Sequence, residues 1–298
     1  MDPKTRIQHF QELFPHEPHF RIDQINAALF LRENTGWNDL SNIPKHIRES
    51  MEEKTPWYSI SLYNIFISQK KDTHKAILQT SDNQKFESVL MENRTGAWTI
   101  CVSSQIGCAM KCSFCATGTM GIKRNLSSDE IVDQYRFWNA AIQPHERISN
   151  IVFMGMGEPL ANYENVRHAI NQILKHTDVG RTKITVSSVG IIPQLERILT
   201  DKEWPHVRLA VSLHAPNDTL RKKIVPTSAP HFMKKIATWA REYQKILGNR
   251  KHHLTFQYIL LAGVNDSTAH ATELAKYVSN IGHVKVNVIH YNLVEGKT

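Results

Sequence analysis

The chain of 298 residues is poor in cysteine, with four in all and none after Cys115. It opens with Met-Asp-Pro-Lys-Thr-Arg and lacks the apolar stretch of a secretory signal. It also lacks any apolar run near the roughly 18–20 residues that span a bilayer. These absences exclude a membrane-spanning protein and predict a cytoplasmic one, where thiols stay reduced. Clustered cysteines in such a protein indicate a metal-binding or catalytic site before a disulfide framework.

The net charge of +8 is distributed unevenly. Residues 1–93 contain 11 Lys and Arg against 13 Asp and Glu, whereas the remainder contains 25 against 15. A basic domain suits a polyanionic partner such as RNA, because neutralising phosphates gives sequence-independent affinity. Ordinary solubility charge explains the same numbers equally well, so charge alone does not decide between them.

The hydrophobic pattern divides the chain into three regions. Residues 1–56 predict a small helical accessory domain, because apolar residues such as Ile22, Ile25 and Leu29 recur every three to four positions. Residues 57–93 alternate with a period of two and predict a β-rich connecting segment. Residues 94–298 are expected to form the main domain. The helices expected in the first region cover residues 4–14, 21–33 and 43–54.

Expected strands and helices alternate throughout the main domain. The strands cover residues 97–102, 149–154, 182–188, 207–213, 254–261 and 284–290. The helices cover residues 127–142, 162–176, 191–200, 217–247 and 267–280. This alternation is typical of an α/β fold whose parallel sheet has right-handed crossovers and is either open or curled into a barrel.

Residues that could carry chemistry follow the carboxyl ends of these strands, where parallel βα folds place their sites. The first strand leads from Cys101 into a loop with three cysteines, and the second leads into Gly155-Met156-Gly157-Glu158-Pro159. Later strands end at the polar segments Ser187-Ser188, Ser212-Leu213-His214 and His290-Tyr291-Asn292. Each segment alone could consist of turn or cap residues, but their common position favours one shared site.

The cysteine loop has the spacing Cys108-x3-Cys112-x2-Cys115. A structural zinc site needs four ligands, so Cys101 would have to serve as the fourth from the preceding strand. Three thiolates in one loop instead suit a 4Fe–4S cluster with one iron left open to a small molecule. The cluster is the favoured interpretation, and zinc remains the alternative.

The same spacing, with Phe114 before the last cysteine, resembles the radical S-adenosylmethionine signature, and the second strand's glycine-rich segment resembles that family's second motif. Further blocks are similar to the RlmN/Cfr class, which methylates an adenine carbon in 23S ribosomal RNA and, in some members, in transfer RNA. The resemblance runs from about residue 20 to the end. Its blocks cover residues 101–108, 153–160, 211–218 and 263–266.

The resemblance implies a partial (βα)6 radical-SAM barrel, a 4Fe–4S cluster and S-adenosylmethionine. Cys108, Cys112 and Cys115 would bind the cluster. Glu87 would accept a proton, and Cys101 would form a transient disulfide with a second catalytic cysteine near the family's C-terminus. The residues that would contact S-adenosylmethionine are Gly157, Glu158, Ser187, Ser212, Leu213, His214 and Asn292.

The sequence departs from the family because no cysteine follows Cys115 and no last helix follows the sixth strand. We therefore expect either a C-terminally truncated copy that does not complete methyl transfer or a divergent enzyme with another hydrogen donor. The expected partners of this monomer are 23S ribosomal RNA, transfer RNA and an electron donor such as flavodoxin. The alternatives are a radical-SAM enzyme with another substrate and a metal-stabilised RNA-binding remnant.

Overall fold

One curved sheet runs through most of the molecule, which is described here from a computed structural model covering residues 4–248 and 254–292. Within these residues its strands are β1 Ile60–Ile67, β2 Thr73–Thr80, β3 Lys85–Glu92, β4 Trp98–Cys101, β7 Ile148–Phe153, β8 Ile184–Ser188, β9 Arg208–Ser212, β10 Thr255–Leu260 and β11 Lys285–His290, adjacent in that order. The strands β1 to β4 pair antiparallel, and β4 and β7 to β11 pair parallel. The six parallel strands confirm the predicted α/β fold.

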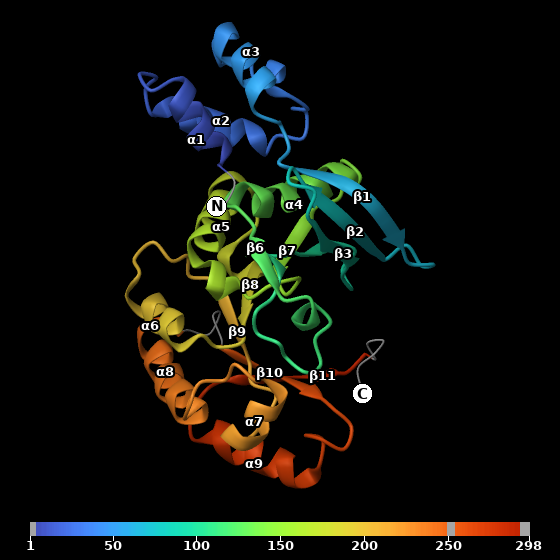
Figure 1. The fold of residues 1–298 in the computed structure, drawn as a ribbon, viewed down its shortest axis with the longest axis vertical. Helices are drawn as coiled ribbons and strands as arrows, with labels where there is room; N and C mark the ends of the chain where they lie inside the picture. The colour runs from blue at the N-terminus through green and yellow to red at the C-terminus, as the bar shows by residue number, and fades with distance from the viewer. Residues whose placement is uncertain (1–3, 249–253, 293–298) are drawn as a thin grey trace.

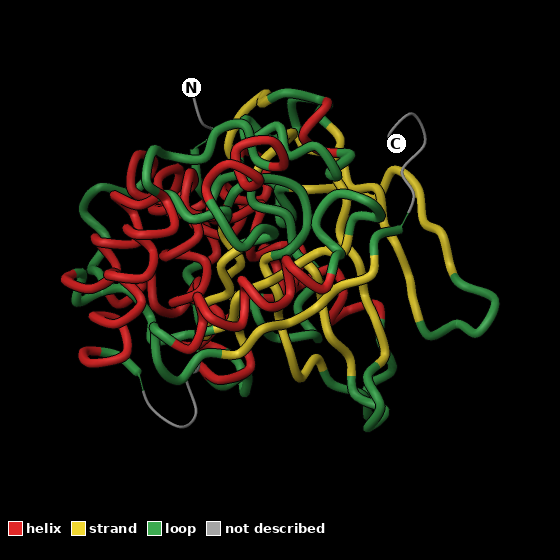
Figure 2. The backbone as a smooth tube through the Cα atoms, turned by 90° about the horizontal axis from the view of Figure 1, so that it is seen from below, coloured by secondary structure: helices red, strands yellow, loops and turns green. Residues whose placement is uncertain are grey.

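Helices gather on one side of this sheet (Figure 2). They are α4 Ser128–Ala141, α5 Tyr163–His176, α6 Ile192–Thr200, α7 Asp218–Ile224, α8 Phe232–Ile246 and α9 Thr268–Ser279. The strand residues that face them, such as Ile100, Ile151 and Val186, are fully buried and form the main core. We call the opposite side of the sheet the inner face. No helix among the described residues is long and apolar enough to cross a membrane.

The first region forms a helical head with a core of its own (Figure 1). Its helices are α1 Arg6–Leu13, α2 Phe20–Leu29 and α3 Lys45–Lys54. All three predicted helices are present, but the second ends at Leu29 and not at residue 33. Trp37, Ile47 and Met51 are buried among them. The strands β1 to β3 follow the head and extend the main sheet through the pairing of β3 with β4. The domain boundaries at residues 56 and 93 stay predictions.

A buried carboxylate fastens the head to helix α4. One oxygen of Asp133 lies 2.6 Å from the guanidinium of Arg6, and the other lies 2.5 Å from that of Arg136. Ser59 donates to the same carboxylate from its backbone N–H and its hydroxyl, both at 2.7 Å. Arg136 also donates to the carbonyl of Leu29 at the end of α2. Burial alone would raise the pKa of Asp133, but the two guanidinium groups outweigh it and lower this pKa to about 2.

The single long helix predicted over residues 217–247 is wrong. The structure contains two helices there, α7 and α8, separated by residues 225–231. Pro226 and Pro230 lie in this break, and each lacks the N–H that a helix interior needs. His231 adopts a φ of +56° immediately before α8 begins. The break brings the segment after α7 over the cysteine loop, where the hydroxyl of Thr227 donates to the carbonyl of Met110 at 3.2 Å.

Candidate active site

A two-stranded hairpin holds the cysteine loop. The loop leaves β5 (Gln105–Gly107) and returns in β6 (Ile122–Asn125), and these strands pair antiparallel. The N–H of Cys108 donates to the carbonyl of Gly121 at 2.9 Å and closes the loop at its base. Gly107 has a φ of +77°, and a Cβ atom there would lie 1.8 Å from that carbonyl oxygen. Glycine is therefore required at this position for the loop to close.

Replacing Gly107 with alanine should open the base of the loop. The positive φ alone costs about 1–3 kcal/mol for a non-glycine residue, and the clash with Gly121 adds to it. We expect faster reaction of the loop thiols with a thiol reagent and a lower content of bound iron. Gly180→Ala is the matched control, because Gly180 has a φ of −75° and no atom near its Cβ position. Equal thiol reactivity in both variants would contradict the requirement for Gly107.

The three loop thiols lie close enough to affect each other electrostatically. Burial raises the pKa of Cys112 to about 12, and the charges of Cys115 and Cys108 add to this effect. Burial also raises the pKa of Cys108 to about 11, with smaller contributions from Glu158 and Cys115. Cys108 and Cys112 therefore keep their protons in the absence of a metal. A bound iron cluster would supply positive charge and displace the protons.

The donor set fits an iron–sulfur cluster better than a single metal ion. Among residues 4–248 and 254–292, no three His, Cys, Asp or Glu side chains converge on one point where a single ion could bind. A 4Fe–4S cluster takes each thiolate on a different iron, so its ligands surround a shared space and do not converge. Cys108, Cys112 and Cys115 act on each other's charge, so they are near neighbours. The zinc alternative therefore finds no support in the geometry.

Cys101 lies apart from the loop thiols, on the inner face of β4. Burial raises the pKa of its thiol to about 11, a hydrogen bond with the backbone of Met154 opposes this, and the charge of Glu87 adds to it. Glu87 belongs to β3, and Met154 directly follows β7, whereas the groups that act on Cys108 and Cys112 include the other loop thiols. All four cysteines are reduced in the structure, so it gives no support to a disulfide at Cys101.

Glu87 lies beside Cys101 on the inner face of β3. Its carboxylate is 45% exposed and forms an ion pair with Lys75 of β2 at 3.2 Å. Its backbone carbonyl accepts a hydrogen bond from the hydroxyl of Ser103 at 2.5 Å, which fixes the strand against the segment before the cysteine loop. The structure thus gives Glu87 a fixed backbone and an accessible carboxylate.

The glycine-rich segment after β7 packs tightly on the start of the hairpin. Gly157 has a φ of +100°, and a Cβ atom there would lie 2.5 Å from the Cβ of Gln105. Glu158 is buried, and its carboxylate oxygens accept from the N–H groups of Leu160 at 3.0 Å and Val189 at 2.7 Å. Burial raises the pKa of Glu158 despite these hydrogen bonds. The carboxylate therefore joins the ends of β7 and β8 next to the thiol loop.

Predicted residues on β8 and β9 lie at the same edge. The hydroxyl of Ser187 donates to the side-chain oxygen of Gln257 on β10 at 3.2 Å. The carbonyls of Ser212 and Leu213 both accept from the guanidinium of Arg221 at 2.5 Å. The structure therefore brings these three positions together through Gln257 and Arg221, neither of which the sequence singled out.

His214 packs against the cysteine loop through its ring. The ring centroid lies 4.7 Å from that of Phe114 in an edge-on arrangement, and its Nδ1 atom accepts from the N–H of Ile259 at 3.1 Å. Burial lowers the pKa of His214 to about 3, with a smaller contribution from Arg221, so the ring is neutral at physiological pH. Asn292, predicted at the same edge, is exposed at the last described residue, two positions beyond β11.

Arg221 is a buried cation that sequence reasoning missed. Its guanidinium donates to the carbonyl of Val189 at 2.5 Å and lies 3.6 Å from the ring centroid of Phe232. Its charge opposes the rise in the pKa of Cys112, which places it near the thiol loop. In the sequence it belongs to a run of basic residues on a short helix, and such runs usually face solvent, so no local signal distinguishes it.

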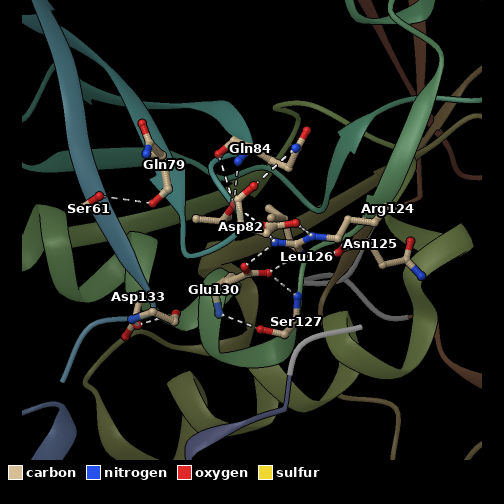
Figure 3. A network of polar contacts seen from close by, with 12 residues as sticks. Ser61, Gln79, Asp82, Gln84, Arg124, Asn125, Leu126, Ser127, Glu130 and Asp133 are labelled. Carbon is tan, nitrogen blue, oxygen red and sulfur yellow. Dashed lines mark hydrogen bonds and ion pairs between the residues drawn. The ribbon is translucent and has the colours of Figure 1, made fainter. Parts of the chain in front are cut away.

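Arg124 is a second missed residue, and it fixes the hairpin that holds the cysteine loop (Figure 3). It pairs with both oxygens of Asp82 at 2.9 and 2.7 Å, and with both oxygens of Glu130 at 2.9 and 2.8 Å. Glu130 also accepts from the N–H of Ser127, which caps α4. Arg124 thereby joins β6, the turn between β2 and β3, and the start of α4. Arg124 therefore stabilises both the hairpin that holds the cysteine loop and the turn that leads into β3, the strand of Glu87.

Comparison with known proteins places this arrangement in a family. Residues 102–275 match the family model of the Radical SAM superfamily. Ribosomal RNA large subunit methyltransferase N of Nitrosopumilus maritimus is 40% identical over 289 residues, which cover 93% of this chain and 80% of that protein. The probable dual-specificity RNA methyltransferase RlmN of Dictyoglomus thermophilum is 38% identical over 282 residues, which cover 93% of this chain and 78% of that protein.

A solved structure has the same fold over nearly the whole chain. The crystal structure of a radical SAM methyltransferase from Sphaerobacter thermophilus superimposes with a TM-score of 0.84 at 33% identity, covering 96% of this chain and 83% of the other. The sequence relatives and the superposition extend beyond the barrel to include the helical head and β1 to β3. The chain belongs to the radical SAM superfamily and, within it, to the RlmN family.

Proposed function

We propose that this protein is a radical-SAM RNA methyltransferase that acts on C2 of an adenine in 23S ribosomal RNA and in transfer RNA. One observation carries the proposal: three mutually interacting thiols lie at the carboxyl edge of a parallel sheet, against Glu158 and His214, which follow β7 and β9. The names of the relatives, which are RNA methyltransferases, support the substrate class. The excess of basic residues after residue 93 supports a polyanionic substrate.

In this proposal Cys108, Cys112 and Cys115 hold a 4Fe–4S cluster that an electron donor such as flavodoxin reduces. When bound, the cluster and S-adenosylmethionine supply one-electron chemistry and the methyl group. The protein supplies position and shielding. Its residues that would bind S-adenosylmethionine are Gly157, Glu158, Ser187, Ser212, Leu213, His214 and Asn292.

Glu87 acts in this proposal as the general base. C2 of adenine is an electron-deficient aromatic carbon, so it must lose its proton after the new carbon–carbon bond forms. The carboxylate of Glu87 is accessible on the inner face, beside the thiol of Cys101, and forms an ion pair with Lys75 at 3.2 Å. An accessible carboxylate on the same surface as the substrate is what a general base requires.

The test uses the purified chain, reconstituted with iron and sulfide without oxygen and reduced by flavodoxin or dithionite. We expect cleavage of S-adenosylmethionine to 5′-deoxyadenosine that increases when 23S ribosomal RNA is added. If RNA does not change the rate at which S-adenosylmethionine is cleaved, the enzyme acts on another substrate. If the purified protein contains zinc and no iron, it is a metal-stabilised RNA-binding remnant. Mass spectrometry of the same RNA then measures methyladenine. Because no cysteine follows Cys115, we expect no methyladenine to form.

A further inference from the structure

Two aromatic side chains are exposed on β1, at the edge of the sheet. Tyr63 is 58% exposed and Phe66 is 53% exposed. The strand β1 forms one edge of the sheet and projects with β2 away from the body of the molecule (Figure 1). Large aromatic side chains are usually buried, so an exposed pair on one strand calls for a partner.

The strand register places both rings on the inner face. Phe66 pairs with Lys75, and Val89 pairs with Cys101. Because side chains alternate along a strand, Phe66, Lys75 and Val89 share the face of Cys101. A bulge between Leu62 and Asn64 restores Tyr63 to this face, where Lys85 reaches it. The rings and the proposed base therefore lie along one continuous surface.

A lysine ammonium lies over each of the two rings. The ammonium of Lys85 lies 3.3 Å from the ring centroid of Tyr63, and that of Lys75 lies 5.5 Å from the ring centroid of Phe66. Lys75 also forms the ion pair with Glu87, which connects the aromatic pair to the candidate active site. Each ammonium lies over one face of its ring, and the rest of each ring is exposed. The exposed part offers a stacking surface for a base, and the ammonium offers charge for a phosphate in the same place.

We propose that Tyr63 and Phe66 form a stacking platform for unpaired RNA bases that flank the target adenine, with Lys75 and Lys85 at the phosphates. The inference rests on the proposed function and adds the surface that grips the substrate. Proteins read single-stranded RNA by stacking its bases on aromatic side chains. The platform lies at the end of the surface that carries Glu87. Bases that stack on it would therefore hold the adjacent target adenine near the candidate active site.

The opposite face of β1 provides a comparison within the same strand. Leu62 pairs with the buried Leu78, so it points away from the inner face, and it is 47% exposed. Its aliphatic side chain offers hydrophobic area without a stacking plane. A second copy of this chain that covers the edge of β1 would bury side chains of both faces, whereas RNA stacking involves the inner face alone.

Fluorescence anisotropy with a labelled RNA hairpin, whose loop contains an unpaired adenine, tests the platform on the complete chain. We expect Tyr63→Ala and Phe66→Ala each to weaken binding about tenfold, because one base loses its stacking partner. Tyr63→Phe should retain the affinity, because the ring remains. Leu62→Ala should bind as the wild type does. Lys75→Gln and Lys85→Gln should each reduce the slope of log affinity against log salt by about 1.

Equal affinity of the wild type, Tyr63→Ala and Phe66→Ala would overturn the platform and leave the proposed function intact. A wild-type protein that binds its cluster but no RNA would overturn both. A fully paired duplex bound as tightly as the hairpin would also overturn the platform, since paired bases cannot stack on the rings. Analytical sedimentation tests for a dimer. A wild-type dimer that Leu62→Ala and Phe66→Ala both abolish, without a change in RNA affinity, would show that a second copy of the chain covers this edge.

Discussion

Replacing Cys112 with alanine should remove nearly all iron and sulfide from the reconstituted protein and reduce cleavage of S-adenosylmethionine by more than about 100-fold. In metalloproteins, mutation of a residue that only orients a ligand lowers metal affinity or activity about 10–100-fold, and loss of a ligand lowers it further. Cys112 is half-buried, and both other loop thiols act on it, as expected for one of three ligands of a shared cluster. Iron and sulfide analysis, visible absorption and electron paramagnetic resonance measure the loss.

Cys101→Ala is the matched control for this prediction. Cys101 is also a half-buried thiol with a raised pKa, but the groups that act on it are Glu87 of β3 and Met154 after β7. We therefore expect Cys101→Ala to bind as much iron as the wild type. Equal loss of iron in both variants would show that Cys101 is a fourth ligand and would bring back a closed four-thiol site.

Replacing Asp133 with alanine should lower the free energy of unfolding by about 3–5 kcal/mol, because it leaves two buried guanidinium groups without their carboxylate. Arg136 pairs with this carboxylate at 2.5 Å, and without it Arg6 would keep only the longer ion pair with Asp129 at 3.5 Å. Urea denaturation at neutral pH measures the change. The control is Asp23→Ala, which removes an exposed ion pair with Lys175 that also links the head to the main domain. A similar loss in the control would show that the head is held by many weak contacts and not by Asp133.

The same carboxylate predicts a pH dependence. The folded protein lowers the pKa of Asp133 to about 2, from an ordinary value of about 3.9. The stabilisation is therefore fully present above about pH 3.9 and is lost as the pH falls through about 2, because protonation removes the charge from the pair. Asp133→Asn should show a smaller fall in unfolding free energy over this acid window than the wild type.

Local sequence signals were sufficient to predict the alternating strands and helices, except for the break between α7 and α8. The apolar faces of the parallel strands repeat over short distances, and α4 carries its capping residues within its own sequence, at Ser127 and Glu130. The resemblance to the radical SAM family added the cluster cysteines and the glycine-rich segment. These features are contiguous in the chain, so their identity is visible without knowledge of the fold.

Contacts between distant residues could not be predicted in this way. Arg124 joins Asp82 across 42 positions, and Arg6 joins Asp133 across 127. A charged residue that pairs only in the folded state has the same local sequence as one that faces solvent, so Arg221 could not be distinguished from Lys222 and Lys223. The exposed pair Tyr63 and Phe66 also depended on the register, because a one-residue bulge decides which face Tyr63 occupies.

The separation between Arg6 and Asp133 has a consequence for synthesis on the ribosome. Chains grow from the N-terminus at about 5–20 residues per second, so Arg6 waits roughly 6–25 s for the carboxylate to be made. During this time the helices of the head can assemble on their own core around Trp37 and Met51. The nascent head therefore presents an unpaired arginine and an uncovered docking surface to chaperones and proteases until α4 is complete.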